Sequence, residues 1–122
     1  FPRPEQEDLV QTVKLAREIL PGEVAVQVPP NLADPLPLVE AGANDLGGIS
    51  PVTRDEINPN SPWPREEELK RSLFSYELKE RLPVYPRLIK KGWHGYKTRR
   101  LIALLAGEDG LRRKSISSRA CR

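Results

Sequence analysis

ANDLGGISPVT, at positions 43–53, runs from a short apolar start into polar side chains, two glycines and a proline. We expect a strand that ends near Leu46 and opens into a shaped loop. Gly47 and Gly48 allow backbone angles or close approaches that a side chain would block. The polar residues beside them supply hydrogen-bond donors and acceptors. This combination fits a loop that faces a ligand, and it also fits a tight turn whose polar groups satisfy loop amides.

The segment before this stretch predicts alternating helices and strands. Apolar residues at helical spacing indicate a one-sided helix over 5–20, which Pro21 and Gly22 end. The elements that follow are a buried strand over 24–28, a two-turn helix over 36–41 and a second strand over 43–46. This order is typical of a βα-repeat sheet with parallel strands. In such folds, ligands bind at the edge where the carboxyl ends of the strands meet.

The two predicted strand ends supply the candidate binding residues. Gln27 is a polar residue in a buried strand, so it needs a partner, either in a polar interior or on the loop of a neighbouring strand. Asn31 follows two prolines and either positions a ligand or caps the next helix. The candidates that face substrate or cofactor are Gln27, Asn31, Asn44, Asp45, Gly47, Gly48, Ser50 and Thr53.

The second half of the chain predicts one longer helix and several short elements. A helix is expected from Arg65 to about Arg81, with three glutamates in a solvated first turn. The later elements are a short strand over 82–86, a helical turn over 87–91 and a helix over 97–106. Each of these is short, so their bounds depend on packing rather than on intrinsic preference.

Three aromatic or titratable residues have more than one interpretation. Trp63, between two prolines, either forms the floor of a pocket or fills a hydrophobic gap. Trp93 is expected to pack as a buried aromatic. His94 is of a residue type that often acts as an acid or a base in catalysis, but it lies outside the motifs described below, and no catalytic residue is assigned.

Charge is distributed unevenly along the 122 residues, which leave room for one small domain. Residues 1–86 hold 9 Lys+Arg and 15 Asp+Glu, whereas residues 87–122 hold 11 and 2. Residues 1–111 are expected to form one domain, and 112–122 a basic, disordered tail. The tail could neutralise phosphates, but it lacks aromatic residues for base stacking, so no nucleic acid is expected as a partner.

The composition also argues against membrane and metal proteins. No run of about 18 apolar residues exists and no leader is recognised, so we expect no membrane span and a cytoplasmic protein. Cys121 is the only cysteine and His94 the only histidine. Because a Cys/His metal site needs more ligands than these two, we assign no metal ligand.

Four ordered motifs resemble a known enzyme family. They are VQVPPNL at 26–32, GANDLGGISPVT at 42–53, Asn58-Pro59 followed by PWP at 62–64, and RLPVYP at 81–86. They resemble the carboxyl-terminal part of the CofG-type subunit or half of 7,8-didemethyl-8-hydroxy-5-deazariboflavin (FO) synthase. This family consists of radical S-adenosylmethionine (SAM) enzymes.

The resemblance implies an α/β fold: the last two or three βα units of a TIM-like radical SAM barrel, followed by a short helical tail. In the intact enzyme, a lyase, a [4Fe-4S] cluster cleaves SAM to a 5′-deoxyadenosyl radical. That radical closes the ring of a hydroxybenzyl-ribityluracil intermediate, which gives the deazaflavin. The implied partners are the amino-terminal remainder of the barrel and a CofH-type subunit or fused half that supplies the intermediate.

The sequence departs from this family at the cluster. The family holds its cluster with a Cys-x3-Cys-x2-Cys loop, which this chain lacks, and a complete barrel needs about 250 residues. We therefore expect a fragment of the longer enzyme whose first residues, Phe1-Pro2-Arg3-Pro4, are extended. We expect this fragment to bind neither cluster nor SAM alone and to be inactive by itself. The alternative is a small non-enzymatic α/β interaction protein whose basic tail binds RNA or another polyanion.

Overall fold

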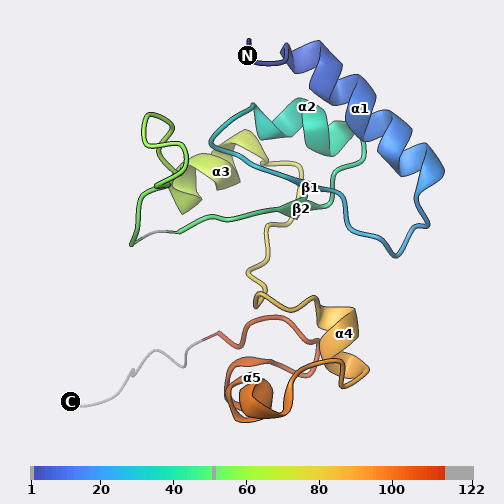
Figure 1. Ribbon diagram of the computed structural model, residues 1–122, viewed down its shortest axis with the longest axis vertical. Helices are drawn as coiled ribbons and strands as arrows, with labels where there is room; N and C mark the ends of the chain where they lie inside the picture. Colours follow the sequence, from blue (N-terminus) through green and yellow to red (C-terminus); the bar gives the residue numbers. More distant parts are fainter. Residues whose placement is uncertain (1, 51, 115–122) are drawn as a thin grey trace. The chain divides into compact units, whose positions relative to one another are not determined.

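The computed structural model describes residues 2–50 and 52–114, which divide into two compact units, Phe1–Glu77 and Leu78–Arg122 (Figure 1). The elements of the first unit are α1 (Gln6–Ile19), β1 (Gln27–Val28), α2 (Pro35–Glu40), β2 (Asp45–Leu46) and α3 (Glu66–Ser72). The second unit contains α4 (Pro86–Lys90), a 3-10 helix η1 (Tyr96–Thr98) and α5 (Arg99–Leu105). The described residues thus form a small α/β structure, and the predicted class is confirmed.

The helix α1 forms where the apolar spacing predicted it. Glu7 and Asp8 lie in its first turn and Arg17 in its last, so the charges at both ends interact favourably with the helix dipole. Leu20 takes an extended conformation, with ψ of 142°. It precedes a proline, which disfavours a helical conformation at that position, and the helix therefore ends there.

The sheet of the first unit consists of β1 and β2, which run parallel with Gln27 opposite Asp45 and Val28 opposite Leu46. Both strands are shorter than predicted. The Val24 amide donates to Pro21 O in a turn, and the Val26 amide donates to the side chain of Asn44. These two amides are therefore not available for a longer backbone ladder.

A small core joins α1, α2 and the strands. Val13, Val28, Leu38 and Ala43 are buried together, and Leu38 is 1% exposed. The helix α2 connects the two parallel strands and packs beside α1, as Figure 1 shows. This packing fixes the carboxyl ends of β1 and β2 next to each other.

The helix predicted from Arg65 to Arg81 is shorter in the structure, where α3 ends at Ser72. The Ser72 hydroxyl donates to Leu69 O over 3.1 Å, and the Tyr76 amide closes a turn onto Leu73 O. Serine hydroxyls compete with the helix for backbone carbonyls. Burial of Leu69 and Leu73 fixes the first two turns but does not extend further.

The second unit has its own small core of Leu82, Ile102 and Ala106. The strand predicted over 82–86 is wrong, because this segment contains no strand and leads directly into α4. It contains two prolines, which cannot donate to a ladder. Leu82 packs on α5 instead.

Residues at the start of the predicted tail are ordered. Arg112 forms an antiparallel bridge with Ala106, and its guanidinium lies 2.8 Å from the Glu80 carboxylate. The Arg113 amide donates to Leu105 O over 2.7 Å. The expectation of disorder is therefore wrong for Arg112 and Arg113, whereas residues 115–122 of the predicted tail lie outside the described residues.

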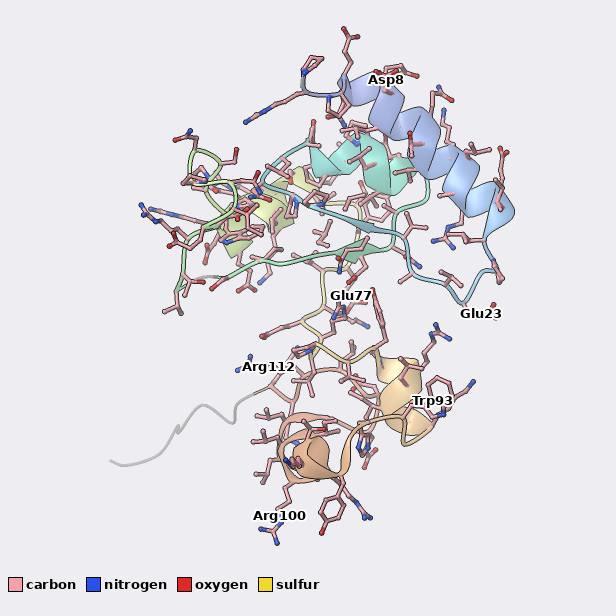
Figure 2. All side chains as sticks on the ribbon, viewed as in Figure 1. Asp8, Glu23, Glu77, Trp93, Arg100 and Arg112 are labelled. Carbon is pink, nitrogen blue, oxygen red and sulfur yellow. The ribbon has the colours of Figure 1, made fainter. Side chains whose placement is uncertain are left out.

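Trp93 lies in the turn after α4 (Figure 2) and is 74% exposed, so its predicted burial is wrong. Gly92 just before it has φ of 70°, which turns the chain away from α4 and leaves the indole in solvent. None of the helices within residues 2–50 and 52–114 is long and apolar enough to cross a membrane.

Candidate binding cavity at the ends of two parallel strands

A cavity of about 370 Å³ opens beside the carboxyl ends of β1 and β2. The described residues that line it belong to the first unit. They are Gln27, Pro29, Asn31, Leu32, Gly47, Gly48, Asp55, Ile57, Asn58 and Trp63. The two predicted strand ends therefore meet at one cavity, as the parallel arrangement requires.

Gln27 and Gly47 form one wall of the cavity. The Gln27 Nε2 atom donates to Asp45 Oδ2 over 2.7 Å, so its partner is on the neighbouring strand. Its side chain lies directly over Gly47, where an added Cβ would collide with the Gln27 amide. The close approach predicted for Gly47 is confirmed, because an added side chain would force Gln27 away from this position.

Gly48 and Trp63 form a second part of the wall. Gly48 has φ of 70°, and an added Cβ would lie 3.1 Å from the Trp63 ring. Trp63 is half-buried and lines the cavity. The structure thus favours the pocket interpretation of this tryptophan.

Asn31 and Asp55 form the third part. The Asn31 Nδ2 atom donates to Asp55 Oδ2 over 2.9 Å and to Ser61 O over 3.0 Å. Asn31 does not cap α2, because the Asp34 carboxylate accepts the Leu36 amide in that role. The remaining atom, Asn31 Oδ1, is buried and has no hydrogen-bond partner among the described residues.

Asp55 is held by its own loop. Its carboxylate accepts hydrogen bonds from the backbone amides of Ile57 and Asn58 and from Asn58 Nδ2, each over 3.0 Å. The hydrogen bond from the Asn58 side chain is the largest reason that the pKa of Asp55 lies below its ordinary value of 3.8. Donors aimed at a carboxylate stabilise its charged form, so Asp55 is an anion at neutral pH.

Three candidates are engaged away from the cavity. Asn44 Oδ1 accepts from the Val26 amide over 2.9 Å and from Arg17 over 3.4 Å, at the amino end of β2. Ser50 Oγ accepts from the Thr53 amide over 3.1 Å and from Thr53 Oγ1 over 2.8 Å. None of these three is among the lining residues, and their contacts support the backbone.

Sequence reasoning missed several residues of the wall. Three of them, Asp55, Ile57 and Asn58, follow the glycine loop. The sequence pattern that could have indicated them is an aspartate three residues before an asparagine, which is typical of a hydrogen-bonded turn. Neither Pro29 nor Leu32 carries chemistry that a pattern could single out. Only folding places them beside the polar residues.

A second cavity, of about 460 Å³, lies in the second unit and is lined by Gly92, His94, Tyr96 and Arg99. His94 Nδ1 is buried without a hydrogen-bond partner among the described residues. No candidate from the motifs lies at this cavity. We assign it no role in the site.

The electrostatics of the strand-end cavity restrict its ligands. Asp55 is one of the lining residues and Asp45 pairs with another, Gln27, whereas no lysine or arginine is among the described residues that line the cavity. The described residues contain no group of three His, Cys, Asp or Glu side chains suited to a metal ion. An iron–sulfur cluster needs cysteine thiolates, and residues 2–50 and 52–114 contain none. These residues do not fit such a cluster.

The fold and the cavity define an α/β segment with a cavity at the ends of two parallel strands, where polar side chains stand among apolar ones. Comparison with curated proteins identifies the family. The chain is 53% identical over 111 residues to the 7,8-didemethyl-8-hydroxy-5-deazariboflavin synthase of Methanococcoides burtonii, covering 91% of this chain and 34% of that protein. The synthase of Archaeoglobus fulgidus is 54% identical over 114 residues, with shares of 92% and 35%.

The synthase of Methanosarcina barkeri is 50% identical over 114 residues, covering 93% of this chain and 35% of that protein. The chain belongs to the FO synthase family, and it spans about a third of the length of the curated relatives it matches. No family model matches the chain. No solved structure matches it.

Proposed function

We propose that this chain is the carboxyl-terminal segment of a radical SAM FO synthase, which forms the deazaflavin chromophore. The observation that carries the proposal is the register of Gln27 opposite Asp45, which brings two strand ends to one cavity. The same residues lie in motifs that resemble the family, in a chain about half identical to named synthases. The proposal therefore has support from both geometry and sequence.

In this proposal, β1 and β2 are neighbouring strands of a TIM-like barrel, and α2 is the helix between them. Within the described residues each strand pairs only with the other. Parallel strands of a barrel pair on both sides. The remaining strands would come from the rest of the synthase, residues 1–111 would belong to the barrel domain, and 112–122 would be its tail.

The proposed role of the cavity is to hold substrate or SAM. Gln27, Asn31, Asp45, Gly47 and Gly48 would face the ligand, because they line the cavity or pair with a residue that does. Asn44, Ser50 and Thr53 would shape the loops around it. The segment would orient the ligand and exclude water, since a reactive radical needs protection from side reactions.

The cluster and SAM belong to the intact enzyme in this proposal. When bound there, they would provide the radical chemistry for ring closure of the hydroxybenzyl-ribityluracil intermediate. The cluster would be held by cysteines in the rest of the synthase, because the described residues do not fit it. A CofH-type subunit or fused half would supply the intermediate, and the isolated chain would be inactive.

Anaerobic reconstitution with iron and sulfide tests this proposal. The 122-residue chain and the intact synthase that contains it are treated in parallel and given SAM and a reductant. We expect a cluster absorbance and 5′-deoxyadenosine only with the intact synthase, and FO only when the intermediate is added. Cluster-dependent 5′-deoxyadenosine formation by the 122-residue chain alone would contradict the proposal that the rest of the synthase holds the cluster. Intact synthase that forms no FO would contradict the function.

A further inference from the structure

Asn31 has a fixed orientation at the cavity. Its Nδ2 atom donates to two acceptors, the Asp55 carboxylate and Ser61 O. Rotating the amide by 180° would place Oδ1 against both acceptors and lose both hydrogen bonds. The Oδ1 atom is therefore held as an acceptor on the other side of the amide.

That acceptor has no donor within the described residues. Asn31 Oδ1 is buried, and leaving a buried acceptor unpaired is unfavourable. The same side chain lines the strand-end cavity. A ligand that brings an N–H or O–H group to Oδ1 recovers this loss, whereas a ligand with only acceptors does not.

The position of Asp55 explains how the orientation is maintained. Asp55 is a carboxylate with no proton to donate, and four donors surround it: two backbone amides and the side chains of Asn31 and Asn58. An acceptor-only group can be paired only with the Nδ2 side of Asn31. The charge of Asp55 also opposes a ligand carboxylate or phosphate in the cavity, since no cation lines it.

We infer that Asp55 is a positioning residue that acts through Asn31, and that Asn31 Oδ1 accepts a hydrogen bond from an uncharged, donor-bearing part of the substrate. This inference rests on the proposed function and names the ligand of the cavity. The hydroxybenzyl-ribityluracil intermediate carries a uracil ring and hydroxyl groups that can donate. The carboxylate of SAM has the wrong charge for this position, but its ammonium group, ribose hydroxyls and adenine amine can donate, so SAM at Asn31 is the alternative that the two affinities measured below decide.

The variant Asp55→Asn tests the mechanism. An amide at position 55 can donate from Nδ2, which leaves only Ser61 O to hold the Nδ2 side of Asn31, so Asn31 can turn its Oδ1 toward position 55 and present a donor to the ligand. We expect the dissociation constant for the intermediate to rise about tenfold, the effect of roughly one hydrogen bond. The dissociation constant for SAM should change less than about twofold, and calorimetry on the intact synthase without reductant measures both.

A double-mutant cycle separates positioning from a general structural effect. Asn31→Ala removes the acceptor and should also raise the dissociation constant for the intermediate about tenfold. In the Asn31→Ala background, Asp55→Asn should have no further effect. Glu56→Gln is the matched control, because Glu56 pairs with Arg54 in the same loop and its loss removes one negative charge without touching Asn31.

The outcomes distinguish this inference from the proposed function. Additive effects of Asp55→Asn and Asn31→Ala, or an equal loss of SAM affinity, overturn the inference while FO formation by the unsubstituted synthase still supports the function. A loss in Glu56→Gln equal to that in Asp55→Asn overturns it as well, because charge alone would then explain the result. An unsubstituted synthase that neither binds the intermediate nor forms FO overturns both.

Discussion

Gln27 and Asp45 are register partners on two parallel strands, and Gln27 Nε2 donates a 2.7 Å hydrogen bond to the Asp45 carboxylate. This cross-strand pair lies over Gly47 at the wall of the cavity. Its geometry depends on the register of β1 and β2, since a shift by one residue would turn Gln27 to the other face. This hydrogen bond therefore forms only when the two strands keep this register.

Gly47→Ala should break this pair. The new methyl group would occupy the space of the Gln27 amide, and it would lie 2.7 Å from Gln27 Cγ. We expect a loss of about 1–3 kcal/mol in the free energy of unfolding, typical of an overpacked site. Urea denaturation followed by circular dichroism measures it.

Gly22→Ala is the control for this substitution. Nothing lies within 4 Å of a Cβ at Gly22, so alanine is expected to leave the stability within about 0.5 kcal/mol. Equal losses for the two substitutions would show that the contact between Gln27 and Gly47 is not the cause.

Asn44→Ala should lower stability without changing ligand affinity directly. The Asn44 side chain accepts from the Val26 amide and from Arg17, and it is not a lining residue. Removing it leaves the Val26 amide without its partner, which is expected to lower the free energy of unfolding by about 1–2 kcal/mol. A tenfold loss of affinity for the intermediate with unchanged stability would instead place Asn44 in the binding site.

Asp55 should make the first unit more sensitive to acid. Its pKa in the folded chain lies below the ordinary value of 3.8, mainly because of the Asn58 side chain. The unfolded chain therefore takes up the proton first as the pH falls, so the stabilisation is present above 3.8 and is lost as the pH drops through the folded pKa.

Urea midpoints measured between about pH 7 and pH 2.5 check the sign. The stability difference between the unsubstituted chain and Asp55→Asn should shrink as the pH falls, whereas the difference for Glu56→Gln should be small throughout. A difference for Asp55→Asn that grows toward low pH would contradict the assignment.

Gly110→Ala should destabilise the second unit. Gly110 has φ of 80°, and a Cβ would lie 2.9 Å from Pro86 Cα and Pro86 O at the start of α4. Gly92→Ala is a matched control, because Gly92 has φ of 70° but open space around it. The loss at Gly110 should exceed the loss at Gly92 by about 1 kcal/mol or more, measured by thermal unfolding. Equal losses would assign the cost to backbone strain alone.

The sequence predicted the parts of the fold that depend on local chemistry. The helix α1, the parallel strand ends and the close approach at Gly47 all follow from apolar spacing and from where glycine and proline stand. The length of α3 could not be predicted, because it depends on how the Ser72 hydroxyl pairs. The exposure of Trp93 depends on a turn at Gly92 whose direction no periodicity encodes.

The meeting of the two strand ends was predicted in outline and not in detail, and the ligand-facing role of the residues there stays a prediction. Strand order was enough to bring Gln27 and Asp45 together, because parallel strands place their carboxyl ends at one edge. The separation of Asn44 from the cavity depends on which end of β2 each residue occupies, and the strand bounds were too uncertain to fix that. Asp55 was missed because its role arises from contacts with Asn31, which lies 24 positions earlier.

The lining residues of the strand-end cavity, within the part of the chain that the structure describes, lie between positions 27 and 63. One uninterrupted stretch of polypeptide therefore carries this part of the pocket, so it can be exchanged between homologous synthases as a single cassette. Chimaeras made in this way would transfer its ligand preference without rebuilding the rest of the enzyme.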